Sequence, residues 1–196
     1  DEALFVKNHE PGWVNSGDLG RLDRDGYLWV TGRAKDVIIR SGHNIDPGII
    51  EDALYKHAEV VSAAAVGKLD AYAGELPVAY VQLSPEATVT EADLATFCRE
   101  NILERAANPA NIFIIDSLPL TGVGKISKLT LRHDATERVF AGLLVPLMVD
   151  ENLEITISVA DDKRFGTTVT LAIADGDTAK RQVVESRITD VFSPFT

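Results

Sequence analysis

The sequence predicts a mixed fold of helices and strands, either α/β or α+β, and three observations carry this prediction. Short apolar runs of strand type alternate with turns, as at residues 27–31. Other segments place apolar residues at helical spacing, as at Ile50, Ala53 and Leu54. Of the 196 residues, 45% are hydrophobic and 25% are charged, which is an ordinary globular composition. Such a length fits one domain, or one domain with a smaller one beside it.

The first half of the chain predicts a hairpin, a strand, a helix and two further strands. The Asp25-Gly26 dipeptide between apolar runs is a hairpin signal. Asp46 followed by Pro47 is typical of an N-cap and a first helical residue. The expected elements are strands at 18–22, 27–31 and 37–40, a tight turn at 41–44, a helix at 48–57, and strands at 60–66 and 77–83 joined by a loop at 67–76.

The second half predicts a helix, a buried strand, a loop, a helix and a small ββα unit. Thr90, with Asp93 three residues later, resembles a capping box and marks a helix start. Glycines and polar residues at 119–128 indicate an exposed loop. The other expected elements are a helix that carries residues 94–103, a strand at 112–115, a helix at 129–142, strands at 153–159 and 167–174, and a helix at 178–191.

The charge balance disfavours nucleic acid and anionic membranes as partners. Lysine and arginine number 19 against 30 acidic residues, which gives a net charge of −11. No apolar run approaches the ~18 residues that a membrane span needs, and no basic and apolar leader opens the chain. We therefore expect a cytoplasmic protein with no transmembrane segment. Because Asp1 stands where a methionine would begin a gene product, we also expect a fragment.

Cysteine and histidine usage predicts neither a disulfide nor a metal site. Cys98 is the lone cysteine, and we expect it to be reduced and half-buried on a helix. The four histidines lack the spacing of zinc ligands. Nor does the sequence show a nucleophile motif such as Gly-x-Ser-x-Gly.

Two residues beside glycines are candidates for nucleotide binding. The Asp18 carboxylate could accept hydrogen bonds from the vicinal hydroxyls of a ribose, or it could accept them from turn amides. Arg33 could bind a phosphate or a ribose, although a lone arginine is more often part of a surface ion pair. Both alternatives stay open on the residues alone.

A third candidate is Lys125, which follows Gly122 and Gly124 in the expected loop. The pattern is not a phosphate-binding P-loop, because Pro119 and Ile126 replace the required glycine and hydroxyl. A solvated loop lysine is one interpretation. The paired glycines favour another, a mobile positive charge that moves to a substrate.

Taken together and in order, these motifs resemble the C-terminal part of the adenylate-forming, AMP-binding enzyme superfamily, which includes the acyl-CoA synthetases. The resemblance covers about residues 12 to 132. It rests on the motifs at 12–13, 16–20, 25–28, 31–38, 42–47, 50–51 and 118–126. It implies an α+β fold with a small mixed sheet and flanking helices, preceded by a β-hairpin from the end of a large domain. The ββα extension that follows in the sequence lies outside the resemblance.

The resemblance implies a role for each candidate residue. Asp18 would hold the ribose hydroxyls of ATP, and Arg33 would contact its ribose or phosphates. Lys35 falls at the hinge position, and Lys125 matches the lysine that enters the active site during adenylation. The turn formed by Ser41, Gly42 and His43 would border the path of the CoA pantetheine. Glu51 also matches a family position, and a plain helix-surface residue is an equal interpretation.

The resemblance further implies how the chain divides, and it implies cofactors and partners. Residues 1–34 would be the remnant hairpin of the N-terminal adenylating domain, and residues 35–145 would be the mobile C-terminal domain. Residues 146–196 are expected to form the ββα extension, which the resemblance does not cover. The chain would be inactive alone, because that N-terminal domain, its partner in the same polypeptide, would bind the carboxylic acid, most of the ATP and the Mg²⁺. With it, the enzyme would convert a carboxylic acid to acyl-AMP and then, with coenzyme A, to acyl-CoA, as in fatty acid metabolism.

Two other functions remain open. A related adenylation domain could load its acyl group onto a carrier protein, although no carrier segment with a serine attachment site follows. A non-catalytic binding module is the third possibility. Against it, the sequence keeps the candidate residues Asp18, Arg33, Lys35 and Lys125.

Overall fold

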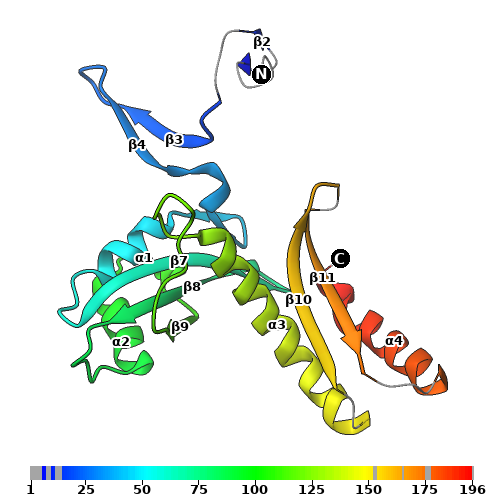
Figure 1. Ribbon diagram of the computed structural model, residues 1–196. Coiled ribbons are helices and arrows are strands. Elements are labelled where there is room, and N and C mark those ends of the chain that lie inside the picture. Colours follow the sequence, from blue (N-terminus) through cyan, green and yellow to red (C-terminus); the bar gives the residue numbers. More distant parts are fainter. Residues whose placement is uncertain are drawn as a thin grey trace. The chain divides into compact units, whose positions relative to one another are not determined.

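The computed structural model describes residues 6–7, 10–11, 15–151, 154–164, 166–174 and 178–195 (Figure 1). The chain divides into two compact units, residues 1–37 and residues 38–196. Gly12 and Trp13, which carry part of the family resemblance, lie outside the described residues.

The first unit contains the predicted hairpin. Its turn is held by Asp23, whose carboxylate accepts hydrogen bonds from the Tyr27 backbone N–H at 2.9 Å and from the Trp29 indole N–H at 2.7 Å. These bonds, the indole bond above all, lower the pKa of Asp23. The elements are β1 (Val6–Lys7), β2 (Glu10–Pro11), β3 (Asp18–Leu22), β4 (Leu28–Arg33) and a 3-10 helix at Ala34–Asp36. The hairpin β3–β4 is antiparallel, as predicted.

The second unit is built on a mixed five-stranded sheet. Strand β8 (Gly74–Leu83) is antiparallel to β7 (Val60–Asp70) along its length. On its other side it pairs with β5 (Ile38–Arg40) at Gly74 and, in parallel, with β9 (Asn111–Ile114). The parallel pair arises because helix α2 (Glu91–Asn101) connects β8 to β9. The fifth strand is β6 (His43–Ile45).

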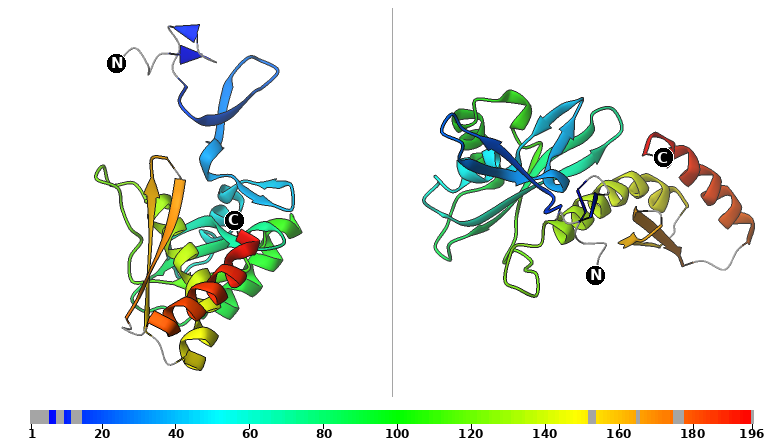
Figure 2. Two further views of the ribbon diagram at one scale, coloured as in Figure 1. Left: turned by 90° about the vertical axis from the view of Figure 1, so that its right-hand side faces the viewer. Right: turned by 90° about the horizontal axis from the view of Figure 1, so that it is seen from above.

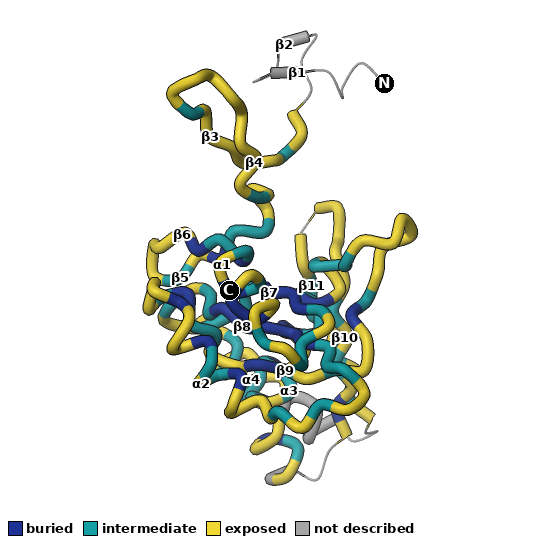
Figure 3. Tube along the Cα trace, turned by 90° about the vertical axis from the view of Figure 1, so that its left-hand side faces the viewer, coloured by how far each residue is buried: buried dark blue, intermediate teal, exposed yellow. Residues whose placement is uncertain are grey.

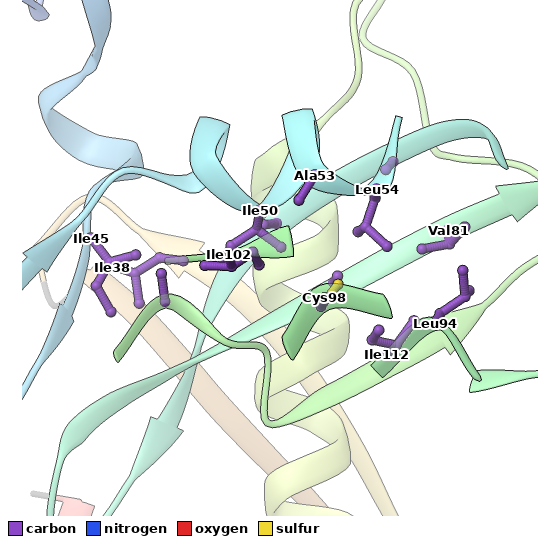
Figure 4. Packing of buried hydrophobic residues seen from close by; sticks show 14 residues of the cluster. Ile38, Ile45, Ile50, Ala53, Leu54, Val81, Leu94, Cys98, Ile102 and Ile112 are labelled. Carbon is purple, nitrogen blue, oxygen red and sulfur yellow. The ribbon is translucent and has the colours of Figure 1, made fainter. Parts of the chain in front are cut away.

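Both faces of this sheet are covered by helices, which explains why β7 and β8 have apolar residues at consecutive positions. Helices α1 (Pro47–Leu54) and α2 (Glu91–Asn101) cover one face, and α3 (Lys128–Glu151) covers the other. Figure 4 shows the first cluster, where Ile50 and Leu54 of α1 meet Cys98 of α2. In Figure 3 the buried residues concentrate in the sheet strands and the helices against them.

Both helix starts that the sequence predicted are confirmed. The Asp46 carboxylate accepts a hydrogen bond from the Gly48 N–H at 2.9 Å, with Pro47 as the first helical residue. Thr90 and Asp93 form a reciprocal capping box at the start of α2. Cys98 is fully buried, so the expectation of a half-buried thiol is wrong.

The loop expected at 67–76 is wrong, because β7 continues to Asp70 and β8 begins at Gly74. The polar residues of this segment pair with distant parts of the chain. The Lys68 ammonium donates to the Asn111 side-chain oxygen at 2.6 Å, and the Glu75 carboxylate accepts from the Ile39 N–H at 2.8 Å. Such long-range partners leave no local pattern in the sequence.

Helix α3 is longer than the helix expected at 129–142 and continues through Pro146. Beyond it lie the predicted ββα elements, β10 (Ile155–Asp162), β11 (Gly166–Ile173) and α4 (Thr178–Phe192). Leu144 and Leu147 of α3 pack with Ile155 of β10 in a third buried cluster. The views in Figure 2 show β10, β11 and α4 lying along α3. The predicted boundary between 145 and 146 falls inside this helix, and the three-part division stays a prediction.

The predicted fold class is confirmed: the chain is α+β, with a small mixed sheet and flanking helices. Within the part of the chain that the structure describes, none of the helices combines the length and the apolar character that crossing a membrane requires.

Candidate functional site

In the first unit, the hairpin register brings Asp18 and Arg33 together. They occupy paired positions on β3 and β4, and the Arg33 Nε lies 3.2 Å from an Asp18 carboxylate oxygen. The Asp18 side chain is 34% exposed and the Arg33 side chain is 67% exposed. Water therefore screens this ion pair, and its contribution to stability is about 0–1 kcal/mol. The pair leaves both groups accessible to a ligand with hydroxyls or phosphates.

Lys35 lies in the 3-10 helix Ala34–Asp36, directly after β4. The hydrogen bond from the Ala34 N–H to the Gly17 carbonyl, at 2.9 Å, attaches the start of this helix to the hairpin. The division between the two units falls after Val37, two residues beyond Lys35. The hinge role of Lys35 stays a prediction.

In the second unit, Ser41 and Gly42 form the two-residue turn between β5 and β6. Their φ angles are 49° and 82°, so both residues occupy the left-handed region that such hairpin turns require. A Cβ at Gly42 would meet no atom within 4 Å, so crowding does not explain the glycine. Glycine is favoured there because of its positive φ angle. Ser41, Gly42 and His43 are all exposed.

A second turn lies against this one, and the sequence reasoning missed it. The Ser41 N–H donates to the Ala73 carbonyl at 2.7 Å, which joins the β5–β6 turn to the tip of the β7–β8 hairpin. At that tip the Asp70 carboxylate accepts from the N–H groups of Ala73 and Tyr72, and these bonds lower its pKa. Tyr72 is 99% exposed. The two turns therefore form one ordered, exposed surface.

The loop that carries Lys125 is fixed by its own backbone. The Thr121 N–H donates to the Lys125 carbonyl at 2.6 Å, and the Ser127 N–H donates to the Pro119 carbonyl at 2.8 Å. Gly124 at the tip has a φ of 77°, with open space around it. The predicted loop is therefore exposed, and it is a small closed hairpin with a bridge between Leu120 and Ile126.

The side chains at and near the tip of this loop are exposed. Lys125 is exposed, and none of the described residues offers its ammonium a hydrogen bond or an ion pair. Val123 is 81% exposed, and Leu120 is 62% exposed. A cation flanked by exposed apolar side chains suits a loop that docks against another protein surface beside an anion.

Glu51 is more than a helix-surface residue. One of its carboxylate oxygens accepts from the Ala65 N–H at 2.8 Å and lies 2.8 Å from the Lys128 ammonium. It therefore connects α1, β7 and the start of α3. The spacing of Lys125 and Lys128 in the sequence gave no signal of this contact.

The structure assigns the candidate residues to two groups. Asp18, Arg33 and Lys35 belong to the first unit, whereas Ser41–His43 and Lys125 belong to the second. Among the described residues, no three His, Cys, Asp or Glu side chains form a group that could hold a metal ion. No residue of the described part of the chain is therefore assigned to the expected Mg²⁺, and no chemical step is derived through it.

Comparison with known proteins identifies the class. Residues 49–125 match the model of the AMP-binding enzyme C-terminal domain family, and these residues include most of α1, the strands β7, β8 and β9, and Lys125. The chain belongs to the adenylate-forming, AMP-binding enzymes, of which it contains the C-terminal domain. The resemblance in the sequence motifs is thus confirmed.

Its relatives are acyl-CoA ligases. The chain is 53% identical over 165 residues to a marinolic acid–CoA ligase of Pseudoalteromonas sp. (strain SANK 73390), a match that covers 84% of this chain and 25% of that protein. The chain thus spans about a quarter of the length of the curated relatives it matches.

Two solved structures have the same fold. ATP-bound MatB from Rhodopseudomonas palustris is 32% identical with a TM-score of 0.59, and the match covers 66% of this chain and 25% of that one. The o-succinylbenzoate CoA synthetase MenE from Bacillus subtilis, in complex with its acyl-adenylate intermediate, is 36% identical with a TM-score of 0.58, covering 67% and 26%.

Proposed function

We propose that this chain is the C-terminal part of an ATP-dependent acid–CoA ligase. In the first half-reaction a carboxylate oxygen attacks the α-phosphorus of ATP, the bond to the β-phosphate breaks, and pyrophosphate leaves. In the second, the CoA thiolate attacks the acyl carbonyl, the bond to AMP breaks, and the thioester forms. The substrates in this proposal follow those that the names of the relatives print, and the particular acid is set outside these residues.

The observation that carries the proposal is the exposed Lys125 ammonium on its closed loop. Attack of a carboxylate on a phosphate brings anions together, which raises the barrier. A lysine ~4 Å away supplies ~4 kcal/mol of gross Coulomb attraction at an effective dielectric constant of ~20. The backbone hydrogen bonds of the loop hold the lysine ready, so little order has to be gained when it docks.

The other candidate residues receive roles from the same proposal. The exposed turn of Ser41, Gly42 and His43 would border the pantetheine path in the second half-reaction. Asp18 and Arg33 would hold the ATP ribose and the adjoining phosphate. Lys35 would be the hinge about which the second unit turns to exchange its Lys125 surface for its Gly42 surface.

The partners and location follow. The N-terminal adenylating domain of the same polypeptide would bind the acid, most of the ATP and the Mg²⁺, so the isolated chain would form no acyl-adenylate. The lone Cys98, which is free, fits a reducing compartment, and we place the enzyme in the cytoplasm.

The experiment separates the half-reactions in the full-length enzyme. Lys125→Ala should slow acyl-adenylate formation by ~10²-fold or more, while thioester formation from supplied acyl-AMP stays near the wild-type rate. Lys163→Ala is the matched control, because Lys163 is an exposed lysine on the β10–β11 turn outside the loop. Equal loss in both half-reactions would refute the role of Lys125. Activity with a carrier protein but not with free CoA would favour the carrier-loading alternative.

A further inference from the structure

Glu51 forms a three-way junction below the Lys125 loop. Its carboxylate oxygen accepts the Ala65 N–H of β7 and pairs with the Lys128 ammonium, each at 2.8 Å. The side chains of Glu51 and Lys128 are only 19% and 22% exposed. Because little water reaches the pair, its geometry is more restrictive than that of an exposed ion pair such as Arg33–Asp18.

Each bond of the junction has a separate structural purpose. The Ala65 N–H faces away from the β7–β8 ladder, so Glu51 satisfies a strand-edge donor that would otherwise lack a protein partner. Tyr55, which directly follows the last residue of α1, contacts the Ala63 carbonyl on the same edge at 3.3 Å. The Glu51 carboxylate is thus fixed on the β7 edge, and it is a rigid anchor for Lys128.

Lys128 connects Glu51 to the base of the Lys125 loop. It is the first residue of α3 and is separated from Lys125 by Ile126 and Ser127 alone. Ile126 packs against the buried cluster below α3, and the Ser127 N–H binds the Pro119 carbonyl. The position of Lys128 therefore restricts where the end of the loop can lie.

We propose that Glu51 is a positioning residue for Lys125, acting through Lys128, a role that rests on the proposed adenylation function. Glu51 does not touch the reacting atoms. It holds the base of the loop so that most loop conformations place the Lys125 ammonium where it can contact the α-phosphate. Loss of the pair widens the range of loop conformations, and the fraction competent for adenylation falls.

The test uses two variants of the full-length enzyme that break the pair in different ways. Glu51→Gln keeps an oxygen for the Ala65 N–H but loses the charge that attracts Lys128. Lys128→Met removes the cation and leaves the Glu51–Ala65 bond intact, so it also serves if the first variant folds poorly. Lys128→Arg keeps the charge and should restore wild-type behaviour. Lys163→Met is the matched control, because it removes an exposed lysine on the β10–β11 turn, away from the loop and from the junction.

The first readout is independent of activity: the rate of tryptic cleavage after Lys125, followed by peptide mass spectrometry. Glu51→Gln and Lys128→Met should each raise this rate about fivefold or more, and combining them should add little. The second readout is kinetic. Adenylation should lose about tenfold in kcat with KM for the acid unchanged, while thioester formation from supplied acyl-AMP stays at the wild-type rate.

The outcomes separate the inference from the function on which it rests. Unchanged cleavage after Lys125 in both variants overturns the positioning role, whatever the activity. Faster cleavage with unchanged adenylation overturns it as well. A wild-type enzyme that forms no acyl-adenylate refutes the proposed function instead, and the cleavage rates still decide whether Glu51 fixes the loop.

Discussion

The hydroxyl of Tyr80 on β8 donates a 2.6 Å hydrogen bond to the Asp134 carboxylate on α3. The same carboxylate accepts from Arg138 at 2.6 Å, and the Arg138 guanidinium lies 4.4 Å from the centre of the Phe113 ring. Burial, together with the Asp134 carboxylate, raises the pKa of Tyr80, so its proton stays in place. This small network attaches α3 to the sheet face.

Tyr80→Phe should therefore lower the free energy of unfolding by about 1.5–3 kcal/mol, the range expected for a hydrogen bond to a charged acceptor. Asp134 keeps Arg138 as a partner, which limits the loss. Urea denaturation measures the change. Tyr55→Phe is the control, because the Tyr55 hydroxyl makes two long contacts with neutral groups, at 3.3 Å to the Ala63 carbonyl and 3.4 Å to the Ser62 hydroxyl, and its side chain is half exposed. Equal effects of the two substitutions would contradict the network.

Acid should destabilise the second unit through Glu59. Its carboxylate accepts the N–H groups of Val89 and Thr88, both at 2.9 Å, and these bonds lower its pKa below the ordinary 4.5. The unfolded chain then binds a proton more readily than the folded chain. The stabilisation is complete above the ordinary pKa and is lost as the pH falls through the lowered one.

The measurement is the free energy of unfolding between about pH 5 and pH 3, compared with Glu59→Gln. The wild type should lose more stability over this range than the variant. Asp70 and Asp93 also have lowered pKa values, so the variant keeps part of the slope. Identical slopes would show that Glu59 titrates normally in the folded chain.

Gly42 and Gly124 offer a matched pair for the two half-reactions. Both have positive φ angles, 82° and 77°, and a Cβ at either would find open space within the chain. Substitution by alanine should therefore lower the free energy of unfolding by about 1–2 kcal/mol at either position, because of backbone strain. In the full-length enzyme, Gly42→Ala should slow thioester formation and Gly124→Ala should slow adenylation. The same pattern from both variants would show that strain alone decides the rates.

Cys98 should resist alkylation. Burial raises the pKa of its thiol to about 11, so almost none is thiolate near pH 8. Iodoacetamide should label the peptide that contains Cys98 only after denaturation, as judged by mass spectrometry. Rapid labelling of the native protein would mean that α2 opens readily from the sheet.

Sequence patterns predicted the elements whose determinants are local. The Asp25-Gly26 turn and the caps at Asp46 and Thr90 depend on neighbouring residues, and each prediction holds. The loop expected at 67–76 fails because Glu75 and Lys68 have their partners on β5 and β9. A polar run whose partners are distant in the sequence has the same pattern as a turn.

The same distinction applies to the candidate site. Motif order identified Lys125 and the Gly42 turn, which the structure describes as exposed, ordered segments. It gave no indication of Ala73 bonded to Ser41, or of Glu51 joined to Lys128, because these contacts arise from packing between elements. Helix α3 passes Pro146 for a related reason: buried Leu144 and Leu147 hold it on both sides of the proline.

The length of α3 has a mechanical consequence. At ~1.5 Å per residue, its 24 residues form a rod of ~36 Å that begins three residues after Lys125 and ends in the extension. A tilt of about 5° at the loop would displace the far end by about 3 Å. A partner that binds the ββα extension and tilts α3 would thus change the position of the Lys125 loop, because the extension packs against the far end of the same helix.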